Sequence, residues 1–456
     1  MIQIDTSLTP NSLLPAIEQM WSISAKKIAR IEASADERDG KTPVFTVGGV
    51  YQPQGWTEWT QGFQYGSAIL QFDATGDDDA LQIGWRGTRR HMHNHVSHGG
   101  VHDHGFNNLS TYGNLLRLGR GGRFDMCEDE AAFYTLALQV SGAVQAARWT
   151  KTSDGGGFIH SFNGPQSLFV DTVRSCRILA VSHLLGHSPQ GEQDAPLDLP
   201  LRLKQHLTKT AEYNVFYGEG RDTWDTPDQR GRTVHETLWN PASGAYRCPS
   251  TQQGYSPFTT WTRGLAWAML GFAEQLELAH KHPELYDDEL IEIMRKAAAA
   301  TCDHFIEHTP TDGVPYWDEG APGLANMGDY RDRPAEPFND HEPVDSSAAA
   351  IACQGLVRLG RYMSEDRYIT AGLTTLRTLL AEPYLSTSDD HEGLLLHSIY
   401  HRPFGWDHVP SGSKIPNGEA CMWGDYHLRE AALHVQRLAK GEAYYTFFGC
   451  VEEGAK

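Results

Sequence analysis

Helical segments alternate with long loops along most of the 456-residue chain. Nine segments place apolar residues near positions i, i+3, i+4 and i+7, the spacing of one buried helix face: 11–34, 129–148, 165–186, 200–214, 260–281, 287–308, 344–359, 364–381 and 418–440. Several loops between them are long and rich in Gly, Pro, His and Trp: 75–128, 215–259, 310–343 and 384–417. Segments 43–47 and 232–238 fit short strands. The pattern predicts an all-α fold, an α/α toroid whose loops build one face.

Nucleotide-binding folds are disfavoured by what the sequence lacks. No GxGxxG follows a strand, no GxxxxGK[ST] occurs, and strands and helices do not alternate as in βαβ units. No Pro/Ser-rich linker divides the chain. We therefore expect a single domain over residues 1–456.

The charge balance limits the classes of partner that the chain can bind. The chain has 38 Lys and Arg against 58 Asp and Glu, a net charge of −20, so no nucleic-acid partner is expected. No apolar run approaches the length of a membrane span, and the first residues do not resemble a secretory signal. The seven cysteines form no CxxC pair, which favours reduced thiols and a cytoplasmic location.

The segment HMHNHVSHGGVHDHGF holds six histidines, at positions 91, 93, 95, 98, 102 and 104. His-x-His spacing is compatible with a metal site, but the segment has no Cys partner and no HExxH pair, and an ordinary polar loop is the main alternative. His102-Asp103-His104 differs from the rest. A carboxylate between two imidazoles is suited to acid–base chemistry.

A second carboxylate, Asp171, stands at the start of an apolar segment. The simplest interpretation is an acid that stabilises a helix N-terminus. Asp103 and Asp171 are 68 residues apart, a spacing compatible with two carboxylates that face each other across a pocket. Glycoside chemistry generally uses two acids with separated pKa values.

Aromatic and polar residues crowd into segment 232–272, which includes His235, Gln253, Trp261, Arg263 and Trp267. Trp faces suit sugar rings, although most single Trp residues only pack. Arg263 opposes the helix dipole at its position, so we expect it to have a partner, either a protein carboxylate or an anionic ligand.

Seven motifs in order resemble one family. They are Trp59-Thr60-Gln61-Gly62-Phe63 (WTDGF in the family), His102-Asp103-His104-Gly105-Phe106 (HDxGF), Val170-Asp171-Thr172 (IDT), Thr251-Gln252-Gln253-Gly254-Tyr255 (THQGY), Arg263-Gly264-Leu265-Ala266-Trp267 (RGQAW), Asp345-Ser346-Ser347-Ala348-Ala349-Ala350 (DSSAAA) and Trp423-Gly424-Asp425-Tyr426 (WGDY). Across nearly its whole length, the chain resembles the unsaturated glucuronyl hydrolases of glycoside hydrolase family 88. The resemblance implies an (α/α)6 barrel with long loops on the active-site face.

The resemblance also implies a reaction. Members of this family remove a 4,5-unsaturated uronic acid from the non-reducing end of oligosaccharides made by polysaccharide lyases, by hydrating a vinyl ether. By this resemblance Asp171 protonates C4 and then activates water for attack at C5. Asp103 holds ring hydroxyls and keeps Asp171 protonated by like-charge repulsion. No metal and no organic cofactor is expected.

Further residues match the family's substrate contacts. By resemblance these contacts are Trp59, Phe63, His102, His235, Gln253, Arg263 and Trp267. Three positions depart from the family pattern, Gln61, Gln252 and Leu265, and each adjoins an expected contact. In the last loop Lys414, with Ser411 and Ser413, is a candidate contact for a sulfate or the second sugar; a flexible polar loop is the alternative.

The expected partner is an unsaturated uronic-acid oligosaccharide, with no nucleic acid and no membrane, and the chain is expected to be a monomer or homodimer. Related alternatives stay open. They are an unsaturated galacturonyl or rhamnogalacturonyl hydrolase of family 105, a lyase or sugar epimerase on the same barrel, a sugar-binding protein without activity, and a metal-binding protein built on the histidines.

Overall fold

A computed structural model describes residues 1–35, 38–39, 41–55 and 58–452. Its helices are α1 (Leu14–Ala33), α2 (Gln61–Thr75), α3 (Asp78–His91), α4 (His93–Val96), α5 (His104–Asn108), α6 (Asn114–Arg120), α7 (Glu128–Ala147), α8 (Thr172–Ser175), α9 (Arg177–Leu184), α10 (Leu199–Asn214), α11 (Thr262–Lys281), α12 (Asp288–His308), α13 (Ser346–Met363), α14 (Asp366–Leu379) and α15 (Met422–Lys440). The strands are β1 (Thr42–Val47), β2 (Val50–Gln54), β3 (Trp149–Lys151), β4 (Gly157–Ile159), β5 (Ser167–Phe169), β6 (Glu236–Trp239) and β7 (Tyr246–Ser250).

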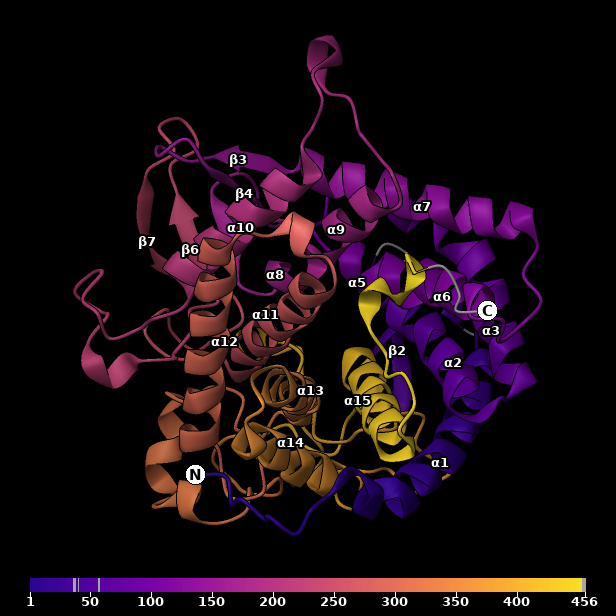
Figure 1. Cartoon of the computed structure of the whole chain (residues 1–456). Helices are drawn as coiled ribbons and strands as arrows, with labels where there is room; N and C mark the ends of the chain where they lie inside the picture. The colour runs from indigo at the N-terminus through magenta and orange to yellow at the C-terminus, as the bar shows by residue number, and fades with distance from the viewer. Residues whose placement is uncertain (36–37, 40, 56–57, 453–456) are drawn as a thin grey trace.

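The helices form two concentric rings (Figure 1). In the inner ring α2 contacts α5, α5 contacts α8, and the contacts continue through α11, α13 and α15 back to α2. In the outer ring α3 packs on α2, α7 and α10 on α9, α12 on α11, α14 on α13, and α1 on α2 and α15. This is an (α/α)6 barrel, and the predicted all-α toroid is confirmed.

Burial separates the two rings. Every residue of α11 from Thr262 to Ala279 is buried, and so is every residue of α13 from Ser346 to Gly360. The outer helix α12 instead buries one face and exposes the other. Asp287 caps α12 by accepting the N–H of Leu290 at 2.9 Å, and Asp345 caps α13 by accepting the N–H of Ser347 at 3.1 Å.

Two sequence expectations were wrong here. Segment 75–128 is not one long loop, because it contains α3 to α6, and α2 precedes it. The buried face of α3 holds a single large apolar residue, Leu81, beside small residues such as Gly84 and Gly87, so its apolar pattern is weak in the sequence. Segment 165–186 begins as strand β5, and its helix starts only at Thr172. The strand forms because β5 pairs with β6, a partner distant in sequence.

Three small antiparallel sheets occur in the described residues: β1–β2, β3–β4 and β5–β6–β7. The predicted strand 43–47 lies within β1, and the predicted strand 232–238 overlaps β6. The sheet β5–β6–β7 places Asp171 two residues after one strand and His235 one residue before the next. For the described ranges, no helix has both the length and the apolar character to cross a membrane.

Candidate active site

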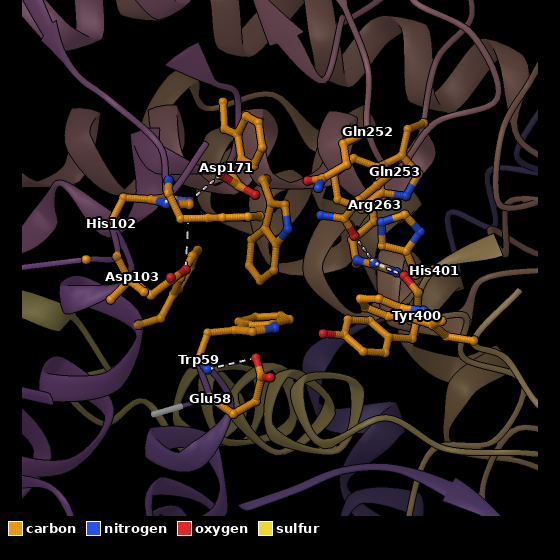
Figure 2. A pocket seen from close by; sticks show the side chains of 18 of the residues that line it. Glu58, Trp59, His102, Asp103, Asp171, Gln252, Gln253, Arg263, Tyr400 and His401 are labelled. Atoms are coloured by element: carbon orange, nitrogen blue, oxygen red, sulfur yellow. Dashed lines mark hydrogen bonds and ion pairs between the residues drawn. The ribbon is translucent and has the colours of Figure 1, made fainter. Parts of the chain in front are cut away.

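A cavity of about 530 Å³ lies among the loops that connect the inner helices, within the range of small-molecule sites. Seven of the ten predicted site residues line it: Trp59, His102, Asp103, Asp171, Gln253, Arg263 and Trp267. Figure 2 shows Asp171, His102 and Asp103 on one side and Arg263 with His401 on the other. The structure therefore brings both predicted carboxylates to one wall.

His102 connects the two carboxylates. Its Nε2 lies 3.3 Å from Oδ1 of Asp171 and 3.8 Å from Oδ1 of Asp103. The N–H of Phe162 donates to Nδ1 of the same ring at 3.2 Å. Because Nδ1 accepts, the neutral ring carries its proton on Nε2 and donates it toward Asp171. Both aspartates are 8% exposed.

The pKa values of the two carboxyls shift in opposite directions. Burial raises the pKa of Asp103, as does the charge of Asp171, and the charge of His102 offsets only part of this rise. Burial also raises the pKa of Asp171. The hydrogen bond from His102 and the charges of His102 and Arg263 outweigh burial, so the net pKa is lowered. In this structure Asp171 is therefore the more acidic of the two carboxyls, and the role of Asp103 in keeping Asp171 protonated stays a prediction.

The segment that carries His102 and Asp103 is fixed directly to α8. Ser175 Oγ donates to the carbonyl of His102, and the N–H of Gly105 donates to Ser175 Oγ at 3.1 Å. A Cβ on Gly105 would lie 1.9 Å from the carbonyl oxygen of Ser175, closer than any side chain permits. Gly105 thus allows the backbone contact that brings Asp103 toward Asp171.

A buried ion-pair network holds the helical turn that follows Asp171. Arg174, fully buried in α8, donates to Glu274 of α11 at 3.0 Å and to Glu430 of α15 at 2.7 Å. Arg177 adds a second bond to Glu274 at 2.9 Å. Because buried charges are costly unless paired with good geometry, these pairs fix α8 against two inner helices. By fixing α8, the network also fixes the position of Asp171, the residue before it.

His235 lies close to Asp171 but is not among the residues that line the cavity. Its Nδ1 accepts the N–H groups of Gln252 at 3.0 Å and Gln253 at 3.4 Å. Burial lowers its pKa to about 3, so the ring is neutral and carries its proton on Nε2. That Nε2 is buried and has no hydrogen-bond partner in the described part of the protein.

Arg263 is held entirely by the protein. Its Nη1 donates to Asp345 at 2.9 Å and to the carbonyl of Ile399, and its Nη2 donates to Gln253 at 2.9 Å and to the carbonyl of Tyr400 at 2.8 Å. Of the two partners open from the sequence, the structure supplies the protein carboxylate. Arg263 joins α11 and the 399–400 loop while its charge faces the cavity.

Aromatic rings form the floor of the cavity. Trp59 stacks on Trp423 with centroids 4.9 Å apart, and Phe106 packs against Trp267 at 5.0 Å. Phe63 packs edge-on to Trp59 at 5.7 Å but is 0% exposed and does not line the cavity. Phe63 therefore packs against the Trp59 ring from outside the cavity.

The remaining predicted contact, Lys414, lies outside the set of lining residues. Its side chain is 72% exposed and pairs with Asp340 at 2.9 Å. Of the three departures, only Gln252 lines the cavity. Gln61 is buried and hydrogen-bonded to His95 at 2.7 Å, and Leu265 is buried in the core.

The histidines of segment 91–104 have separate environments. His104 contacts Ser141 at 2.9 Å and the carbonyl of His98 at 3.1 Å, while His98 lines the cavity. In the regions that the structure describes, no three His, Cys, Asp or Glu side chains converge in a way that holds a metal ion.

The sequence reasoning missed several lining residues, among them Glu58, Tyr400, His401 and Trp406. His401 is 4% exposed, and neither ring nitrogen has a partner among the described residues. Asp407 accepts the N–H groups of Tyr400 at 2.5 Å and His401 at 3.0 Å, which fixes their backbone. The aromatic density of the 384–417 loop was the available signal.

Curated proteins and solved structures resemble the chain over most of its length. No family model matches it. It is 27% identical over 406 residues to the unsaturated glucuronyl hydrolase of Bacillus sp. strain GL1, covering 85% of this chain and 89% of that protein. It is 24% identical to the unsaturated glucuronyl hydrolase of Formosa agariphila, covering 84% and 80%. The resemblance to the unsaturated glucuronyl hydrolases is confirmed.

Solved structures agree on the fold. The crystal structure of the Bacillus sp. GL1 unsaturated glucuronyl hydrolase aligns with a TM-score of 0.69 at 22% identity, covering 94% of this chain and 97% of that one. The Streptococcus agalactiae unsaturated glucuronyl hydrolase aligns with a TM-score of 0.68 at 21% identity, covering 97% and 98%. Another structure of the latter protein holds dGlcA-GalNAc6S.

Proposed function

We propose that the chain is a hydrolase that removes a 4,5-unsaturated uronic acid from the non-reducing end of lyase-generated oligosaccharides. The observation that carries this proposal is the cluster of Asp171, Asp103 and His102 at one wall of an aromatic-lined cavity. The extended similarity to unsaturated glucuronyl hydrolases supports the same activity.

The reaction starts with proton transfer. Asp171 gives its proton to C4 of the double bond, and positive charge develops on C5 and the ring oxygen. Water then attacks C5 and returns a proton to the Asp171 carboxylate. The resulting hemiketal opens, which releases a deoxy keto-uronate and a sugar chain shorter by one residue.

Asp171 must be protonated when the reaction starts, although its pKa is lowered in this structure. An unsaturated uronate carries its own carboxylate and displaces water from the cavity. Both effects disfavour a second negative charge and raise the pKa of Asp171. Substrate binding thus creates the acid that the reaction needs.

The other groups bind and orient the sugar. Trp59 and Trp267 offer ring faces, Gln253 is fixed by Arg263, and the positive charge of Arg263 faces the uronate carboxylate. His235, next to this wall, carries an Nε2–H with no partner among the described residues, which can donate to a sugar hydroxyl or the attacking water once substrate is bound. Asp103, whose pKa is raised, hydrogen-bonds the ring hydroxyls.

We also propose that residues 1–456 form one catalytic domain that works in the cytoplasm as a monomer or homodimer. One hydrophobic core extends from Ile2 to Cys450, which supports the single domain. The seven cysteines are free thiols, which persist in reducing compartments.

The test follows the ultraviolet absorbance of the conjugated C4=C5 double bond in a panel of lyase-generated disaccharides. We expect wild type to abolish the absorbance and Asp171→Asn to lose at least about 100-fold in kcat. Asn has nearly the same size and shape as Asp, and Asp171 makes no side-chain capping bond to α8, so we expect the variant to keep its fold. Equal activity in both proteins would refute the role of Asp171, and inactivity of wild type on every substrate would refute the hydrolase.

A further inference from the structure

The cavity contains a third carboxyl group, that of Glu58, which the reaction described above does not use. Its Oε1 accepts the N–H of Trp59 at 3.0 Å. Among the described residues no Lys or Arg forms an ion pair with it. It lines the same cavity as Asp103 and Asp171.

Positive charge is scarce at this end of the cavity. Arg263 is the one Arg or Lys among the described lining residues; its guanidinium is bonded to the carboxylate of Asp345, and the proposed function assigns its remaining charge to the uronate carboxylate. Burial lowers the pKa of His401 to about 4, so that ring is neutral near pH 7. An anionic group beside Glu58 would therefore meet repulsion without compensation.

The placement of Glu58 relates it to the second sugar. In Figure 2 the Trp59 ring lies between Asp171 and Glu58, and the Glu58 carboxyl points toward the Tyr400 hydroxyl. The reacting uronate must contact Asp171, and we place the second sugar toward Glu58, Tyr400 and Trp406, which line the same cavity. We infer that Glu58 restricts the second sugar to uncharged ones and rejects sulfated or carboxylated sugars, an inference that rests on the proposed function.

The charge on Glu58 depends on pH. Burial raises its pKa to about 7; the N–H of Trp59 opposes this rise and the charge of Asp103 adds to it. The other titratable groups around the cavity are His98, His102, Asp171, Arg263, Tyr400 and His401. Glu58 is therefore mostly ionised at about pH 8 and mostly neutral at about pH 6, so rejection is stronger at the higher pH.

The experiment compares two lyase-generated disaccharides that differ by one sulfate on the second sugar. Calorimetry measures their Kd for Asp171→Asn, which separates binding from turnover, and wild-type kcat/KM is measured in parallel. At about pH 8 we expect the unsulfated disaccharide to bind at least about ten-fold more tightly. Adding Glu58→Gln to the Asp171→Asn protein should reduce the ratio of the two Kd values at least about five-fold. Lowering the pH to about 6 should also reduce this ratio. The control Glu18→Gln, at an exposed site on α1, leaves the ratio unchanged.

Each result has one meaning. A ratio near one at about pH 8, or a ratio that Glu58→Gln does not change, overturns the inference even when both disaccharides are hydrolysed. Binding with the expected discrimination but no hydrolysis by wild type supports the role of Glu58 and refutes the proposed function.

Discussion

The imidazole of His102 donates from Nε2 toward Asp171 across 3.3 Å, and its other nitrogen is occupied by the N–H of Phe162. This bond lowers the pKa of Asp171 before substrate arrives. In the proposed reaction the bound uronate acts in the opposite direction. The proposed acid function of Asp171 is thus coupled to binding.

One prediction concerns the pH–rate profiles. The reaction needs protonated Asp171, so the rate falls as pH rises through its pKa. The kcat/KM profile reports the free protein, where this pKa is lowered, and the kcat profile reports the complex, where the uronate raises it. We expect the alkaline limb of kcat at higher pH than that of kcat/KM. Steady-state kinetics on one unsaturated disaccharide measures both limbs, and coincident limbs contradict the coupling.

Gly105→Ala should strongly reduce activity. The new Cβ would lie 1.9 Å from the carbonyl oxygen of Ser175, so the segment with His102 and Asp103 must move away from α8. We expect kcat to fall at least about 100-fold, because small misplacements of catalytic groups are costly. The control is Gly99→Ala, where a Cβ meets nothing within 4 Å. Comparable kcat values for the two variants would contradict the proposed geometry.

Arg263→Lys should be destabilising despite retaining the charge. A lysine cannot reproduce the two-pronged contacts to Asp345, Gln253 and the carbonyls of Ile399 and Tyr400. Unsatisfied buried acceptors should lower the free energy of unfolding by at least about 2 kcal/mol, measured by urea denaturation. Arg295→Lys, on an exposed pair with Glu292, should change it by less than about 0.5 kcal/mol. Equal losses would show that Arg263 is not a structural junction.

Asp318 gives a prediction about stability against pH. It is 0% exposed, accepts the N–H of Tyr255 at 2.8 Å, and its pKa is raised to about 6 by burial. Because the folded protein binds this proton more tightly than the unfolded chain, stability from this group falls as pH rises from about 4 to 6. The Asp318→Asn variant has no titrating carboxyl at this position, so it does not lose stability in this way as pH rises. Its unfolding free energy relative to wild type should rise by about 2 to 3 kcal/mol between about pH 4 and 8.

The control for that measurement is Asp390→Asn, an exposed position in the loop before Gly393. Its stability relative to wild type should not vary over the same pH range. A pH-independent difference for Asp318→Asn as well would contradict the raised pKa.

Lys414→Ala should have little effect. Its side chain is 72% exposed and its ion pair with Asp340 lies outside the cavity lining. Exposed pairs contribute little energy. We expect KM to change less than about two-fold with sulfated and unsulfated disaccharides, and a selective rise in KM with the sulfated one would restore Lys414 as a contact.

The sequence predicted the outer helices α1, α7, α10, α12 and α14, which each have one apolar face, but it missed the outer helix α3. The inner helix α2 was missed because Gln61 to Asp73 are all buried, so polar residues such as Gln64 and Gln71 break any stripe. The motifs located Asp103, Asp171 and Arg263. They did not locate Glu58 or His401, whose place in the cavity depends on loops from distant parts of the chain.

The stacked rings of Trp59 and Trp423 join an early segment of the chain to the last inner helix. A growing polypeptide on the ribosome contains both aspartates long before it contains Trp423. The floor under the sugar is therefore absent until α15 has been synthesised. A chain truncated before α15 should have no residual hydrolysis, and activity should emerge in a single step only after α15 has left the ribosome.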